Sequence, residues 1–287
     1  MGPAPQDSTA VPVRPMEFDP CLGDVPRHFA GHGDLLLSHV FAVLSSVFPE
    51  GEAYFVRSVE AARNRITDSR LRQEVEGFIG QEKMHGREHG VFNDRLAELG
   101  YPVGPIGRYI RRLTALRERF LSEKANLAVV AALEHYTATL AETLLGEPEA
   151  RAEIGHEGAR HLFLWHALEE AEHKAVAFDV YRHRGGTERM RILTMWAIHL
   201  NFVLETSVWT VISLGLDPTA RRHPVRVLRS LGRLRRSPFF SLRVVGRLRR
   251  YHRRGFHPCD WDTSDLISTW RAELFGGDGA LTDVLAH

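Results

Sequence analysis

Four long stretches of helical periodicity, separated by glycine and proline, most limit what this 287-residue chain can fold into. They cover residues 49–67, 69–99, 108–145 and 149–184. No segment of appreciable length alternates apolar and polar residues, as a half-buried strand would. Long helices joined by short connections and unaccompanied by strands pack as bundles. The sequence therefore predicts an all-α fold with a four-helix bundle at its centre.

The segments around the bundle divide the chain further. An apolar helix is expected over Leu35 to Ser46, and Pro49 is expected to end it and begin the next helix, since proline is tolerated in a first turn. Residues 1–15 are polar and Pro-rich with no apolar core of a signal peptide, which predicts a disordered leader. Residues 16–188 then form the bundle, and residues 189–287 form a helical C-terminal extension.

Cysteine usage bounds the chemistry of the chain. Its two cysteines, Cys21 and Cys259, are far apart and show no CxxC spacing. They provide neither a thiolate zinc site nor a disulfide framework, so a reducing, cytoplasmic setting is expected.

The extension combines an apolar stretch with a basic one. Residues 192–216 are long and apolar enough for a membrane span, but Glu205 near their centre is costly there, which favours a helix packed on the bundle or a partner. Thirteen arginines and no acidic residue follow between Arg221 and Arg254, whereas the rest of the chain carries all 36 acidic side chains. The arginines alternate with apolar residues, which predicts amphipathic helices.

Three kinds of partner suit such basic helices. They can pack on the acidic body of the same chain or on a second copy in a homodimer, or lie peripherally on an anionic membrane. Binding to nucleic acid is not expected, because no recognised nucleic-acid module accompanies the arginines.

Two Glu-x-x-His pairs carry the chemistry of the sequence: Glu82/His85 and Glu170/His173. A three-residue step in an α-helix returns to nearly the same face, so both members of a pair can approach one ion. A third pair, Glu153/His156, is set aside because Gly155 lies within it and its surroundings are polar. His166 precedes Glu170 by one turn, which places three candidate ligands in one stripe.

Ferritin-like di-metal bundles combine two Glu-x-x-His helices with one glutamate from each of two others. Glu134, in an apolar run, and Glu52, before the first pair, are the candidates, with Glu50 as an alternative to Glu52. His89 and His135 are expected to contact the metal-binding side chains or the substrate rather than a metal, and Asp179 is a candidate for orienting a metal-bound histidine.

Several segments together resemble a family of bacterial proteins described as predicted metal-dependent hydrolases. These are FPEGEAYFVRSV at 48–59, GFIGQEKMHGREH at 77–89, ALEHYTATLAE at 132–142, WHALEEAEHKAVAFDVY at 165–181 and GFHPCDWD at 255–262. The ligand pattern also resembles ferritin-like di-iron carboxylate proteins, and the added His166 resembles the arylamine N-oxygenases, with four Glu and three His. These resemblances imply a common set of metal ligands: Glu52, Glu82, His85, Glu134, His166, Glu170 and His173.

Mixed carboxylate and imidazole ligands suit iron, manganese or zinc, and the resemblance to oxygen-activating sites favours two iron ions. The function predicted first is a di-iron oxygenase or oxidase that activates O₂ to oxidise a small organic substrate, with electrons from a donor. The alternative is a hydrolase in which two metals activate water. A second alternative is a non-catalytic ferritin-like metal-binding protein.

Overall fold

The computed structural model describes residues 11–286, which form helices joined by short turns, with isolated β-bridges at Met16–Leu285 and Ala30–Ile154. Four helices make the central bundle: α2 (Leu35–Arg63), α3 (Ser69–Glu98), α5 (Glu123–Gly146) and α7 (Glu157–His173). The all-α class and the bundle packing predicted from the sequence are confirmed.

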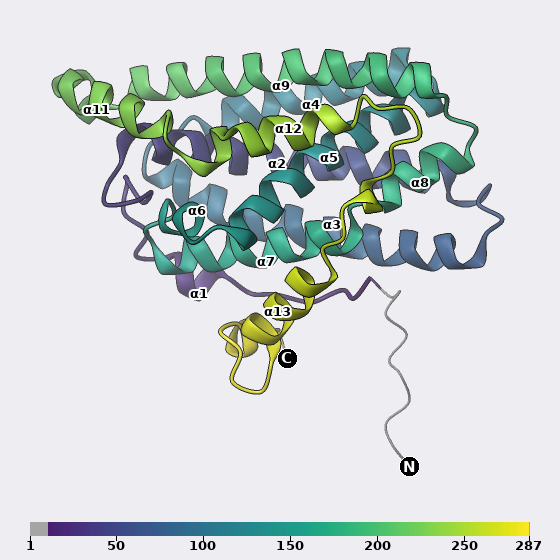
Figure 1. Ribbon diagram of the computed structural model, residues 1–287. Coiled ribbons are helices and arrows are strands. Elements are labelled where there is room, and N and C mark those ends of the chain that lie inside the picture. The colour runs from purple at the N-terminus through teal and green to yellow at the C-terminus, as the bar shows by residue number, and fades with distance from the viewer. Residues whose placement is uncertain (1–10, 287) are drawn as a thin grey trace.

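The bundle is built from two helix pairs that face each other. α2 packs against α3 and α5 against α7, and the pairs meet where α3 contacts α7 and α2 contacts α5. α4 (Val103–Phe120) covers α2, and α8 (Val176–His183) continues α7 against α5 and α3. Figure 1 shows these helices nearly aligned along the long axis of the molecule. Their inward faces enclose the centre where the predicted ligands lie.

Pro49 lies inside α2 rather than at a helix start, so the predicted break after Ser46 is wrong. A proline cannot donate to the carbonyl four residues earlier, here that of Ser45. The side chain of Asn93 on α3 replaces that donor, with its Nδ2 3.0 Å from the Ser45 carbonyl oxygen. The neighbouring helix thus satisfies the freed carbonyl, and α2 runs unbroken over 29 residues.

Two predicted helices are divided in the structure. The stretch 108–145 separates into α4 and α5, because Ser122 caps α5 by accepting a hydrogen bond from the backbone of Ala125 at 3.3 Å. The stretch 149–184 separates into α6 (Pro148–Ala152), α7 and α8. His156, from the pair set aside earlier, caps α7 through its side chain and also contacts Asp24 at 3.0 Å.

The structure describes only part of the predicted leader, because residues 1–10 lie outside the described range. Residues 11–15 are packed along α3 and α7, contrary to the predicted disorder. Added Cβ atoms at Gly77 and Gly80 would lie 2.4 Å and 2.3 Å from atoms of Val11 and Val13, so glycine is required for this approach. Arg14 anchors the segment through ion pairs with two glutamates of α7.

The C-terminal extension wraps the outside of the bundle. α9 (Glu188–Leu216) lies across α2 and α5, and after the short α10 (Pro218–Arg222) the chain forms α11 (Pro224–Leu234), which contacts α2. α12 (Leu242–Arg250) packs on α5, and α13 (Ser264–Phe275) on α7 and α5. By length and composition alone α9 could cross a membrane, which is weak evidence that it does. Figure 1 shows α9 along one long edge of the bundle.

Candidate metal centre

Every helix of the bundle contributes to one buried cluster of ionisable side chains. α2 provides Glu52, α3 provides Glu82 and His85, α5 provides Glu134, and α7 provides His166, Glu170 and His173. Each of these seven residues is at most 4% exposed. The three α7 residues follow the spacing of four and three that places them on one helix face. The structure therefore brings together all seven residues that the sequence analysis selected.

The cluster has two parts that meet at Glu170. Glu52, His85 and His166 form one group and Glu82, Glu170 and His173 another, with the potential ligand atoms of each group within 4.8 Å of one another. Glu170 Oε1 lies 3.0 Å from His166 Nε2, 3.8 Å from His85 Nδ1 and 3.6 Å from His173 Nε2.

Glu134 and Glu82 complete the second part of the cluster. The Nε2 atom of His173 lies 3.1 Å from Glu82 Oε1 and 3.3 Å from Glu134 Oε2. In the first part, Glu52 Oε1 lies 3.7 Å from His166 Nε2. Glutamate oxygens thus surround the inward nitrogen of each histidine from more than one helix.

Most of the inward polar atoms make no hydrogen bond to any described residue. They are both carboxylate oxygens of Glu52, Glu82 and Glu134, together with Glu170 Oε2, His85 Nδ1 and His173 Nε2. Buried polar atoms without partners are costly and rare in folded proteins. Cations held between these side chains would give all seven carboxylate oxygens partners. The residues present therefore fit a metal centre.

The outward nitrogen of each histidine is fixed by another side chain. His85 Nε2 lies 3.1 Å from Glu169 Oε2, and His173 Nδ1 lies 2.8 Å from Gln81 Oε1. His166 Nδ1 lies 2.8 Å from His89 Nε2. Metal-bound histidines characteristically use their second nitrogen in this way, which fixes the ring orientation. The remaining nitrogen of each ring faces the glutamates.

Electrostatics in the cluster are dominated by burial and by like charges. Burial and the neighbouring carboxylates raise the pKa of Glu52 and of Glu82 well above the ordinary value, and raise that of Glu134 to about 7. Burial lowers the pKa of His85. For His173 burial acts downward, but Glu170 and the other carboxylates raise its pKa well above the ordinary value. Four carboxylates so close together need compensating positive charge.

The alternative residues considered from the sequence lie elsewhere or play other parts. Glu50 faces outward and pairs with Arg111 at 2.7 Å, so Glu52 is the glutamate that enters the cluster. His89 contacts His166, as described above, whereas His135 lies 3.2 Å from the backbone oxygen of Arg247. Asp179 pairs with His257 at 2.8 Å, outside the cluster, so the prediction that it orients a ligand is wrong.

Sequence reasoning missed the side chains that support the histidines. Glu169 and Gln81 give no spacing signal, because each is adjacent in sequence to a predicted ligand and would be assigned to another helix face. Arg14 explains why Glu169 is tolerated at 0% exposure: its Nη1 atom lies 2.8 Å from Glu169 Oε1. Burial nevertheless raises the pKa of Glu169 to about 8. Glu169 and Gln81 connect the cluster to the ordered N-terminal segment, since Gln81 Nε2 donates to the Pro12 carbonyl at 2.8 Å.

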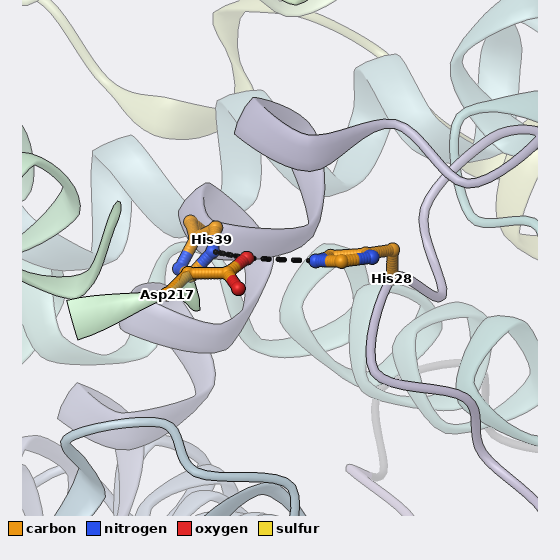
Figure 2. Close-up of side chains that lie close together, drawn as sticks. All are labelled: His28, His39 and Asp217. Carbon is orange, nitrogen blue, oxygen red and sulfur yellow. Dashed lines mark hydrogen bonds and ion pairs between the residues drawn. The ribbon is translucent and has the colours of Figure 1, made fainter. Parts of the chain in front are cut away.

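A second histidine–carboxylate cluster, also missed from the sequence, lies where α9 ends. Asp217 Oδ2 lies 2.8 Å from His28 Nε2 and 3.2 Å from His39 Nε2, and Figure 2 shows the aspartate between the two rings. His39 Nδ1 lies 2.6 Å from the Ser213 hydroxyl. The other carboxylate oxygen accepts a hydrogen bond from the backbone of Thr219 at 2.8 Å. The three side chains are close enough for one ion, but both oxygens of Asp217 already have partners.

Comparisons with known proteins agree with the chemistry of the first cluster. The model of a family described as predicted metal-dependent hydrolase matches residues 12–262 of the chain. No curated protein and no solved structure matches it. The finer resemblance to arylamine N-oxygenases is not confirmed by these comparisons. The chain belongs to the family of predicted metal-dependent hydrolases.

Proposed function

We propose that this family member is a metal-dependent enzyme whose seven-residue cluster holds two metal ions. One observation carries the proposal: carboxylate oxygens from all four bundle helices meet inside the protein without hydrogen-bond partners among residues 11–286. An ordinary structural network would satisfy these atoms with donors. Four glutamates and three histidines instead offer a donor set suited to iron, manganese or zinc.

The distances within the cluster support a division of the seven side chains between the two proposed ions. Glu52, His85 and His166 would hold the first ion, and Glu82, Glu134 and His173 the second. Glu170 would lie between them, because its Oε1 faces all three histidines. Glu169, His89 and Gln81 would hold the ligand rings in place from behind.

Hydrolysis is the reaction that we propose first, since it is the one named in the description of the family. A pair of metal ions supplies an activated water and stabilises charge on the leaving oxygen. The chain itself provides fixed ligand geometry and a low-dielectric interior that strengthens every charge interaction at the centre. The substrate would be a small molecule whose leaving group departs through oxygen, such as an ester.

Oxidation of an organic substrate by O₂ is the second candidate, and the burial of the cluster favours it. All seven residues are at most 4% exposed, which suits access by a diatomic gas better than access by a bulky ester. The donor set, four glutamates and three histidines with no cysteine, is also compatible with iron. This reaction needs an electron donor.

Elemental analysis of protein purified from metal-replete cells tests the shared part of both candidates. We expect two equivalents of metal per chain, and less than one equivalent would contradict a two-metal centre. Assays of the same sample then separate the reactions. Turnover of nitrophenyl esters without O₂ consumption supports hydrolysis, whereas O₂ consumption by the reduced, iron-loaded protein without ester turnover supports oxidation.

A further inference from the structure

The outer face of α9 is a stripe of exposed apolar side chains. Leu193, Leu200, Val203 and Val211 are 58–71% exposed, and they recur at the spacing of one helix face. The opposite face of the same helix, which includes Met195 and Ile198, is buried. An apolar face of this length on the outside of a protein marks a binding surface.

Aromatic and basic groups border this apolar stripe. Trp196 is 59% exposed and stacks on His252, two residues beyond the end of α12, with ring centroids 4.4 Å apart. The C-terminal end of α12 therefore lies close to α9, and α11 follows α9 after one short helix. α11 and α12 also carry exposed apolar residues, with Leu228 67% and Leu242 89% exposed.

Most arginines of the basic segment are free to meet a partner. Arg233, Arg243 and Arg247 pair with carboxylates that lie in the bundle helices or next to their ends. Others, such as Arg229, Arg235 and Arg236, are exposed and have no carboxylate within 4.0 Å anywhere in residues 11–286. The bundle thus neutralises only part of this positive charge.

We propose that α9, α11 and α12 form a surface that docks on an anionic lipid bilayer, with α9 parallel to the membrane plane. Amphipathic helices with arginine on the polar side and leucine or tryptophan on the other bind at such interfaces. Anionic lipid headgroups complement the unpaired arginines. A second copy of this chain is a poorer fit, because a two-fold interface would bring the same unpaired arginines together.

The contacts of α9 argue that it lies on the membrane rather than crossing it. Its inner face packs on α2 and α5, and Arg191 at its start is fully buried. Asp217 fixes the other end through His28 and His39. Crossing a bilayer would separate α9 from these contacts and place Glu205, near its centre, in hydrocarbon.

Vesicle binding by the full-length, metal-loaded protein tests the proposal. We expect cosedimentation with equimolar phosphatidylcholine and phosphatidylglycerol, little with phosphatidylcholine alone, and weakening by salt. The emission of Trp196 is the difference in tryptophan fluorescence between the wild type and Trp196→Phe. Brominated lipids should quench this emission, which would report contact between Trp196 and the bilayer. No binding to the anionic vesicles, or no quenching of Trp196, would overturn the proposal.

Two sets of variants separate the apolar and the charged contributions. Combined Leu200→Ser, Val203→Ser and Val211→Ser should reduce binding at least tenfold, as should combined Arg229→Gln, Arg235→Gln and Arg236→Gln. The control removes the same number of charges from the exposed residues Arg63, Arg70 and Lys83 and should bind like the wild type. An equal loss of vesicle binding in the control would contradict the bilayer as partner. So would a wild-type dimer that the serine substitutions convert to monomers.

Discussion

The two buried histidine–carboxylate clusters differ in how their polar atoms are satisfied. In the bundle centre, both oxygens of three glutamates lack hydrogen-bond partners among the described residues. At the end of α9, one oxygen of Asp217 lies beside the two histidines, as Figure 2 shows, and the other accepts a hydrogen bond from the backbone of Thr219. Proximity of ligand-type side chains is the same in both. Buried polar atoms without hydrogen-bond partners, rather than proximity alone, therefore distinguish a candidate metal site from a structural contact.

The largest expected effect is on metal content. Glu170→Ala removes the carboxylate that faces all three histidines of the centre, so we expect the purified protein to lose most of its metal. Glu142→Ala is the matched control, because Glu142 is also a buried glutamate but pairs with Lys174 and Arg247. Mass spectrometry of metals measures both. If Glu170→Ala retained two metal equivalents, the division of ligands proposed above would be wrong.

Asp217→Ala should have the opposite profile. The aspartate is fully buried and joins His28 and His39 to the end of α9, so its removal leaves several polar groups without partners. We expect a loss of about 3 kcal/mol in the free energy of unfolding, with metal content unchanged. Denaturant titration and metal analysis of one preparation check this. Loss of metal without loss of stability would make this cluster the metal site.

The pH dependence of stability gives a smaller test of the second cluster. Burial lowers the pKa of His39 to about 4, although Asp217 acts against this shift. Between pH 6.5 and 4 the unfolded chain therefore takes up a proton at His39 that the folded chain does not, and the free energy of unfolding falls as the pH falls. We expect this fall to be reduced in His39→Asn by about 2 kcal/mol, less than the full shift allows at about 1.4 kcal/mol per pKa unit.

The control for this measurement is His32→Asn, which changes an exposed histidine in the same part of the chain. Its unfolding curve should keep the wild-type pH dependence. Equal pH dependence in His39→Asn and the wild type would show that His39 titrates normally in the folded protein.

The two clusters also differ in what the sequence reveals of them. Glu82 and His85, or His166 and His173, lie within one helix, so their spacing alone places them on one face. His39 and Asp217 are 178 positions apart and meet only through the packing of α9 on α2, for which no local pattern exists. Glu52 and Glu134 are intermediate, since the bundle architecture indicates one glutamate per helix but does not distinguish Glu52 from Glu50.

Predictions of local structure were wrong where a tertiary contact outweighed the preference of the local sequence. Pro49 predicts a break, but Asn93 of the adjacent helix satisfies the carbonyl that the proline leaves free. The proline-rich composition of residues 1–15 predicts a disordered leader, yet glycines on α3 let residues 11–15 pack closely. In both cases the deciding partner is distant in sequence, and composition carries no record of it.

The smallest expected effect concerns a residue that touches the centre only through a histidine. Gln81 is fully buried and its Oε1 accepts from His173 Nδ1 at 2.8 Å. Gln81→Leu keeps the volume but frees the ring of His173, while all seven ligands stay in place. Loss of such a supporting contact weakens metal binding by roughly 10–100-fold in known sites. We expect the metal affinity to fall about tenfold, or by about 1.4 kcal/mol, because three carboxylates still face His173 Nε2.

Competition with a chelator measures the metal affinity. The matched control is Asn126→Leu, which removes a buried amide near the start of α5 that accepts a hydrogen bond from Tyr54 and should lower stability without changing that affinity. Identical affinities for Gln81→Leu and the wild type would mean that the glutamates alone hold His173, and the distinction between the two clusters would then rest on the ligands themselves.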